Sequence, residues 1–102
     1  MQYQIDLQPE AEDDLNSIYS WSLLNLGRET ADKTMGLILA GIRQLQSFPF
    51  SGSLTPDDYL NKEGYRMLIV GRHAVFYKII GEIIPVYRVV DTRRKYSKLF
   101  YE

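Results

Sequence analysis

Three short runs rich in β-branched and aromatic residues follow one another in the second half of this sequence. They cover residues 65–70, 74–80 and 83–90, and the short segments between them begin with Gly71 and Gly81. Residues of this kind favour strands, and short glycine-containing connections join neighbouring antiparallel strands. The runs therefore predict two consecutive β-hairpins, and the rest of the chain has to pack against that sheet.

The first half of the chain predicts one more strand and two helices. Apolar and polar residues alternate over 3–7, which is typical of a strand with one buried face. Pro9 suits the start of a helix whose apolar stripe ends before Gly27, and a second helix is expected from about Glu29 to Ser47. Because only a turn separates them, the two helices are expected to form an antiparallel hairpin.

The order strand, helix, helix, strand, strand, strand predicts an α+β fold, formed by residues 1–102 as a single domain. We expect an antiparallel sheet with the helical hairpin packed across one face. The segment 50–64 is rich in Ser, Gly, Pro and Asp and predicts an irregular connection. Pro85 lacks an N–H group, so its strand is expected either to lie at a sheet edge there or to contain a bulge. The tail, 91–102, is a candidate for a short terminal helix.

Cysteine is absent and histidine occurs once, which excludes a disulfide framework and disfavours a zinc site. The acidic cluster at 10–14 lies at the start of the first predicted helix, where the helix dipole explains it without a metal. We therefore expect no metal and no cofactor. The longest apolar runs are about four residues, far short of the ~20 needed to cross a bilayer, so a cytoplasmic protein without membrane contact is expected.

The charge of the chain is unevenly distributed, although the net value is only −1. The residues before Tyr65 include four basic and ten acidic side chains, whereas those from Tyr65 onward include eight basic and three acidic side chains. The two parts therefore carry formal net charges of −6 and +5. Such asymmetry favours a basic working surface in the second part, while ordinary segregation of surface charge explains it equally well.

Basic residues and tyrosines alternate in the second part, a mixture that neutralises phosphates and stacks on bases. Within strands the same residues often have structural roles, which applies to Arg66 and Arg88. The cluster at 93–96 follows the last predicted strand, where loops tend to carry function. The candidate target-binding residues are Arg66, Arg72, His73, Arg88, Arg93, Arg94, Lys95, Tyr96 and Lys98.

Several motifs, taken in order, resemble those of the RelE/ParE superfamily of bacterial toxins. They read P-E-A-E-x-D-L at 9–15, L-x-x-F-P-x-x-G at 45–52, Y-R-x-L-x-V-G-R-H-x-V-F-Y at 65–77, V-x-R-V-V at 86–90 and R-R-x-Y at 93–96. The stretch 65–77 is the most specific of them and is similar to the ParE branch. Together the motifs cover nearly the whole chain.

The resemblance implies the toxin of a type II toxin–antitoxin pair. Such a toxin is held inactive in a hetero-oligomer by a cognate antitoxin, whose C-terminal segment wraps around it. Two branches of the superfamily then compete. ParE-like toxins bind DNA gyrase and block replication, whereas RelE-like toxins are metal-independent endoribonucleases that cut messenger RNA on the ribosome.

Within this resemblance, the residues favour the gyrase branch. Alignment on 75–77 puts Ala74 where the nucleases carry a catalytic arginine, and an apolar side chain cannot stabilise phosphate charge. The net charge of −1 also fits poorly with docking to ribosomal RNA. The ribonuclease alternative stays open, with Arg93, Arg94 and Tyr96 as its candidate catalytic residues. A family member that has lost toxicity is a third alternative.

Overall fold

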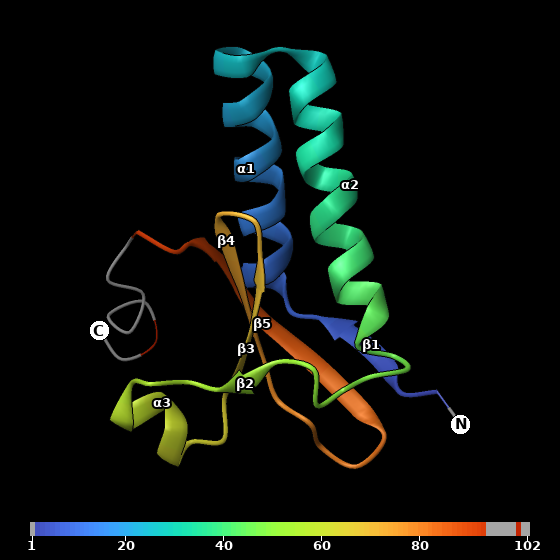
Figure 1. Ribbon diagram of the computed structural model, residues 1–102, viewed down its shortest axis with the longest axis vertical. Helices are drawn as coiled ribbons and strands as arrows, with labels where there is room; N and C mark the ends of the chain where they lie inside the picture. Colours follow the sequence, from blue (N-terminus) through green and yellow to red (C-terminus); the bar gives the residue numbers. More distant parts are fainter. Residues whose placement is uncertain (1, 94–99, 101–102) are drawn as a thin grey trace.

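The computed structural model describes residues 2–93 and residue 100 of the chain (Figure 1). Its helices are α1 (Pro9–Leu26), α2 (Arg28–Gln44) and α3 (Asp58–Lys62). Its strands are β1 (Gln4–Leu7), β2 (Ser53–Leu54), β3 (Arg66–Val70), β4 (His73–Tyr77) and β5 (Ile83–Asp91). The strands form one five-stranded sheet in the order β1-β5-β4-β3-β2.

The predicted helical hairpin is confirmed and packs across one face of this sheet (Figure 1). Pro9 opens α1, and Gly27 follows its last residue with a φ of 91°, a backbone conformation that glycine adopts without strain. The distal part of the hairpin extends past the turn between β3 and β4 (Figure 1). None of the helices in the described part of the chain combines the length and hydropathy required to cross a lipid bilayer.

The sheet is mixed rather than wholly antiparallel, which corrects the prediction. β3, β4 and β5 pair antiparallel as expected, but β1 pairs with β5 in parallel, with Gln4 opposite Ile83 and Leu7 opposite Val86. The alternation over 3–7 indicated which face of β1 is buried. It carries no information about the direction of the neighbouring strand, because both directions bury the same side chains.

Pro85 does not lie at a sheet edge, because β5 runs between β1 and β4. The bulge alternative is confirmed close by. Phe76 pairs with Arg88 and Tyr77 with Val86, so Tyr87 is an additional residue on β5 and the register shifts there. The Pro85 carbonyl still accepts a hydrogen bond from the backbone N–H of Lys78 at 3.1 Å.

The segment 50–64 is more regular than predicted, since it contains both β2 and α3. β2 adds to the sheet beside β3, with Ser53 opposite Met67. α3 begins after Asp57, whose carboxylate accepts a hydrogen bond from the backbone N–H of Leu60 at 3.0 Å and so caps the helix. The predicted terminal helix at 91–102 lies largely outside the described residues.

Apolar clusters cover both faces of the sheet. On the hairpin side, α1 and α2 pack on the strands through Leu15, Ile38 and Ile42, and Leu45, which directly follows α2, belongs to the same cluster. On the other side, the side chain of Leu60 from α3 is fully buried in a cluster with Ala74, Phe76 and Val90, and Phe100 packs against them. α3 therefore gives the second face of the sheet a core that the sequence pattern did not predict.

Candidate functional site

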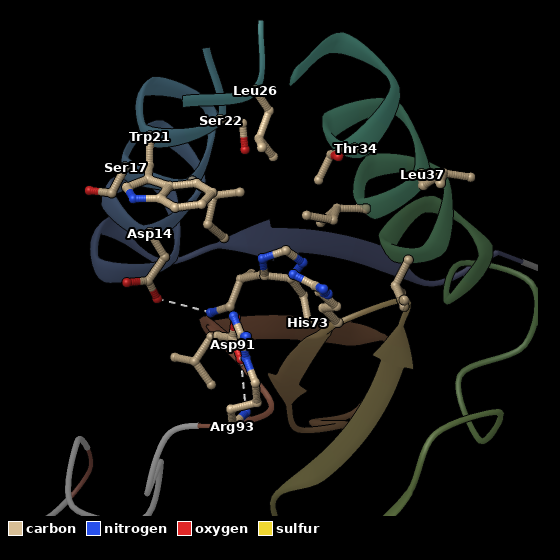
Figure 2. Close-up of a pocket in the computed structure, with 17 residues that line it drawn as sticks. Asp14, Ser17, Trp21, Ser22, Leu26, Thr34, Leu37, His73, Asp91 and Arg93 are labelled. Atoms are coloured by element: carbon tan, nitrogen blue, oxygen red, sulfur yellow. Dashed lines mark hydrogen bonds and ion pairs between the residues drawn. The ribbon is translucent and has the colours of Figure 1, made fainter. Parts of the chain in front are cut away.

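A cavity of about 500 Å³ opens between the distal part of the helical hairpin and the ends of β3, β4 and β5 (Figure 2). Its volume falls in the range of small-ligand and peptide-anchoring pockets. Its walls are largely apolar and include Ile18, Trp21, Leu26, Leu37, Val70 and Val89. Its sheet-side rim is polar and is formed by Arg72, His73, Asp91 and Arg93, which we call the rim.

The turn between β3 and β4 positions two of these side chains. Gly71 has a φ of 59°, a left-handed conformation that lets the two strands connect through Gly71 and Arg72 alone. His73, the first residue of β4, pairs with Asp91 at the end of β5. The carbonyl of Arg72 also accepts a hydrogen bond from the backbone N–H of Thr92 at 2.8 Å, so the turn is tied to the chain that leads to Arg93.

Arg93 and Asp91 form a bidentate ion pair on the rim. The Arg93 guanidinium donates from Nε to Oδ1 at 3.0 Å and from Nη2 to Oδ2 at 2.8 Å, and the Arg93 backbone N–H also donates to Oδ1 at 2.8 Å. These hydrogen bonds hold the pKa of Asp91 well below its ordinary value. The side chain of Arg93 remains 72% exposed, so its charge is balanced by Asp91 but stays accessible to a partner.

Arg72 is the unpaired cation of the rim. Its side chain is exposed and forms no hydrogen bond or ion pair within the described part of the chain. His73 beside it is half-buried, and this burial lowers its pKa. The carboxylate of Asp91 opposes that shift, whereas the positive charges of Arg72 and Arg93 add to it. At neutral pH the imidazole is therefore uncharged, and the rim presents Arg72 as its free positive group.

Two other candidate residues, Arg66 and Arg88, are engaged within the fold and do not line the cavity. Arg88 donates to both carboxylate oxygens of Asp14 on α1, at 2.7 and 2.9 Å, and thereby ties β5 to that helix. Arg66 donates from Nε and Nη2 to the carbonyl of Gly52, at 3.1 and 2.7 Å, and its guanidinium lies over the ring of Phe50. The candidates Arg94, Lys95, Tyr96 and Lys98 lie outside the described residues.

Two of the tyrosines that the sequence suggested for base stacking, Tyr65 and Tyr87, pack within the chain. Tyr65 and Tyr87 meet edge to face, with their ring centroids 5.1 Å apart. The ammonium group of Lys78 lies over both rings, 4.5 Å from the Tyr65 centroid and 5.6 Å from the Tyr87 centroid. Each ring is also half-buried, and this burial raises its pKa. This group lies on the sheet away from the cavity.

Sequence reasoning missed the apolar part of the site. Trp21 and Leu37 line the cavity yet are 59% and 56% exposed, and Figure 2 shows them on α1 and α2 across from His73. A signal was available, because Trp21, Leu24 and Leu37 fall outside the buried stripes of their helices. Large apolar residues on an exposed helix surface often mark a contact with another molecule.

The described residues contain no group of three or more His, Asp or Glu side chains arranged to hold a metal ion. The surface of the site combines a hydrophobic interior with a rim that includes Arg72 and Arg93. Such a surface recognises a partner that carries an apolar group beside a negative one.

Comparison with known proteins identifies the fold and the family. Among solved structures, the chain is similar to a chain of the chromosomal ParDE toxin–antitoxin system from P. aeruginosa, with a TM-score of 0.74 and 20% identity over 88% of this chain and 96% of that chain. It is also similar to a chain of the toxin–antitoxin complex RelBE2 from Mycobacterium tuberculosis, with a TM-score of 0.63 and 16% identity over 89% of this chain and 99% of that chain. No curated protein sequence matches the chain significantly.

At these identities the two solved structures establish the fold alone. A family model covers most of the chain as well: the ParE toxin of the type II toxin–antitoxin system parDE matches residues 5–96. The match begins at the second residue of β1 and includes all the later helices and strands of the described structure. The chain therefore belongs to the ParE toxin family of type II toxin–antitoxin systems, in agreement with the resemblance of its motifs.

Proposed function

We propose that this toxin arrests growth by binding DNA gyrase and that a cognate antitoxin neutralises it. The observation that carries the choice of target is the position of Ala74. Its side chain is fully buried in the apolar cluster with Leu60 and Phe76. A nuclease of the superfamily is expected to have an arginine there, and a buried methyl group beneath α3 neither reaches a phosphate nor stabilises its charge.

The cationic groups of the described residues support binding rather than RNA cleavage. Phosphoryl transfer without a metal needs several free positive side chains around the scissile phosphate. Arg66 and Arg88 are occupied by intramolecular hydrogen bonds, and Arg93 is paired with Asp91. Only Arg72 of these four has no such partner within the described part of the chain.

The rim suits a protein target. Arginine and tryptophan are the residues that most often anchor protein interfaces, and here Arg72 and Arg93 lie at the same cavity as Trp21. We propose that these two arginines contact gyrase. The proposal that an antitoxin neutralises the toxin is supported by the family itself and by the two similar structures, which are a ParDE system and a RelBE2 complex.

The test pairs two assays on the same preparations. Purified toxin is expected to inhibit gyrase supercoiling, and its induction in cells is expected to arrest growth without new cuts in translated messages, as followed by primer extension. The double variant R72A/R93A should lose at least ~30-fold in inhibition, since removal of each arginine anchor is expected to cost more than ~1 kcal/mol. The matched control K62A removes an exposed cation on α3 and should inhibit like the parent toxin.

Unaffected supercoiling together with codon-specific cuts soon after induction would overturn the gyrase proposal and favour the ribonuclease. Normal growth after soluble expression of the toxin alone would contradict toxicity itself.

A further inference from the structure

The cavity between the hairpin and the rim exposes apolar surface of the toxin. Trp21 and Leu26 of α1 line the cavity and are each more than half exposed. Figure 2 shows both side chains, with Thr34 of α2, around the space above His73. Leaving large apolar side chains in water is unfavourable, so free energy is gained when an apolar ligand covers them.

The size and the lining of the cavity suit a small ligand with a hydrocarbon chain. Its volume of about 500 Å³ lies within the range of small-molecule sites. The hairpin contributes Ile18 and Leu26 to its walls, and the sheet contributes Val70 and Val89. A hydrocarbon chain needs no polar partner between such walls and gains free energy with each methylene group that it buries.

One positive group at the cavity lacks a partner. Both carboxylate oxygens of Asp14 accept hydrogen bonds from Arg88, and both oxygens of Asp91 accept hydrogen bonds from Arg93. Arg72 is exposed and has no such partner within the described residues. A single free guanidinium beside an apolar cavity matches a ligand with one negative charge, and a carboxylate can accept two hydrogen bonds from it.

We propose that this cavity is a small-molecule site that binds a medium-chain carboxylate, with its hydrocarbon chain against Trp21 and Leu26 and its carboxylate on Arg72. Charge complementarity favours this ligand over a neutral or cationic one of the same length. The inference goes beyond the proposed function, because the site needs no protein partner. One consequence rests on that function: Arg72 belongs to the surface proposed for gyrase, so the bound ligand and gyrase exclude each other.

Trp21 reports binding directly, because it is the only tryptophan in the chain. Purified toxin is titrated with straight-chain carboxylates from hexanoate to tetradecanoate, each below its critical micelle concentration, and the Kd is taken from tryptophan fluorescence. The signal is expected to saturate at one ligand per toxin. The Kd should fall about 4-fold with each added methylene group and stop falling at the length that fills the cavity.

The carboxylate contact is tested with a neutral ligand of the same length. Decanol should bind the parent toxin at least ~5-fold more weakly than decanoate, since it cannot form a charge-assisted hydrogen bond with Arg72. R72Q removes the positive charge and should bring the two Kd values together. K62Q, which removes an exposed cation on α3, is the matched control and should preserve the difference.

Two leucines of α1 test the apolar wall. Leu26 lines the cavity and is 52% exposed, whereas Leu24 lies outside it and is 86% exposed, so neither replacement removes a core residue. L26N should raise the Kd of decanoate at least ~5-fold, because the hydrocarbon chain loses an apolar contact, and L24N should leave it within ~2-fold. Thermal unfolding identifies any variant with a damaged fold, in which case the comparison of R72Q with K62Q decides.

Three results would overturn the site. The first is equal Kd values of decanoate and decanol for the parent toxin. The second is an equal loss of decanoate binding in L26N and L24N. The third is fluorescence that rises without saturation, as it does when a ligand partitions onto apolar surface at random. Binding of the toxin to phosphatidylglycerol vesicles without binding to free decanoate would assign the exposed apolar surface to a lipid surface instead.

The exclusion of gyrase is tested separately. Saturating decanoate is expected to relieve the inhibition of supercoiling by the parent toxin, and gyrase alone with the same decanoate is the control. Saturated toxin that still inhibits gyrase would contradict the exclusion and leave the site in place. A toxin that does not inhibit gyrase without any ligand contradicts the proposed function, whereas the titration of Trp21 still decides whether the site exists.

Discussion

Tyr77 is the buried residue that fixes the loop after α2. Its hydroxyl donates to the carbonyl of Pro49 at 2.7 Å and accepts from the backbone N–H of Gly52 at 3.1 Å. Y77F leaves both backbone groups without that partner in a buried place, so we expect a loss of about 2 kcal/mol in the free energy of unfolding. Urea titration measures this loss.

The control for this loss is Y65F. The hydroxyl of Tyr65 forms no hydrogen bond within the described residues, so its removal should cost less than about 0.5 kcal/mol. Equal losses in Y77F and Y65F would show that the hydroxyl of Tyr77 does not hold the loop.

His73 should make the stability of the toxin depend on pH between about pH 5 and 8. Histidine is the side chain whose ordinary pKa lies in this range. Burial lowers its pKa in the folded state, whereas the unfolded chain has the ordinary value of about 6.5. Between these two values the unfolded chain binds more protons, so stability is full above about pH 6.5 and falls as the pH drops below it. Tm is therefore expected to decrease on acidification from about pH 8 to about pH 5.5.

H73Q removes the only imidazole in the chain and is expected to flatten this dependence. The same decrease in Tm for H73Q and for the parent toxin would assign the effect to carboxylates instead.

At the scale of the element, two glycines in α2 test how closely the hairpin lies on the sheet. A methyl group added at Gly41 would lie 2.7 Å from Cγ2 of Val70 on β3, whereas one added at Gly36 would meet nothing within 4 Å. G36A is expected to stabilise the toxin by about 0.5–1 kcal/mol, because alanine favours the helix. G41A gains the same helix preference but has to displace the side chain of Val70, so we expect a net loss of about 1–3 kcal/mol.

Urea midpoints of the two variants, measured side by side, decide between these outcomes. Stabilisation by both would mean that α2 moves on the sheet freely, and the close approach at Val70 would not be a constraint.

Elements with a strong apolar periodicity, or with glycine or proline at their ends, were predictable from the sequence. The helical hairpin and the strands β3, β4 and β5 were predicted correctly. Their apolar spacing and the glycines between them reflect the local conformational preferences of the residues. α3 was missed because five residues give no period, although Asp57 is a typical N-cap ahead of it. The direction of β1 was missed because strand pairing between Gln4 and Ile83 is a long-range choice that leaves no local pattern.

The candidate site was predictable only in part, for a related reason. Arg72, His73 and Arg93 stood out by charge and position, and the structure brings them together at one rim. Sequence alone does not show which cations are already paired, and Arg88 meets Asp14 only because α1 crosses β5. Trp21 belongs to the site because of how the hairpin projects, which depends on tertiary packing.

At the scale of the molecule, the sheet is shared by two cores and should make them unfold together. Leu60 is fully buried on one face and Ile38 is almost fully buried on the other. We expect L60A and I38A each to cost about 2–5 kcal/mol and to shift one common transition. Fluorescence of Trp21 on the hairpin and far-ultraviolet circular dichroism should give the same urea midpoint in each variant.

An earlier transition in L60A that is visible by circular dichroism but not by Trp21 fluorescence would contradict this coupling. It would mean that α3 and its cluster unfold apart from the hairpin side.

The parallel pairing of β1 with β5 also affects the order in which the segments of the toxin can fold during translation. The helical hairpin is formed by neighbouring segments, so a nascent chain can fold it early, with Ile42 and Leu45 still uncovered. β1 has to wait for its partner, because Gln4 pairs with Ile83. The rim needs Asp91 as well. A polypeptide whose translation stops before β5 is made therefore carries the hairpin but no assembled rim. If the rim binds the target, as proposed, we expect toxicity only from chains that ribosomes have extended through β5.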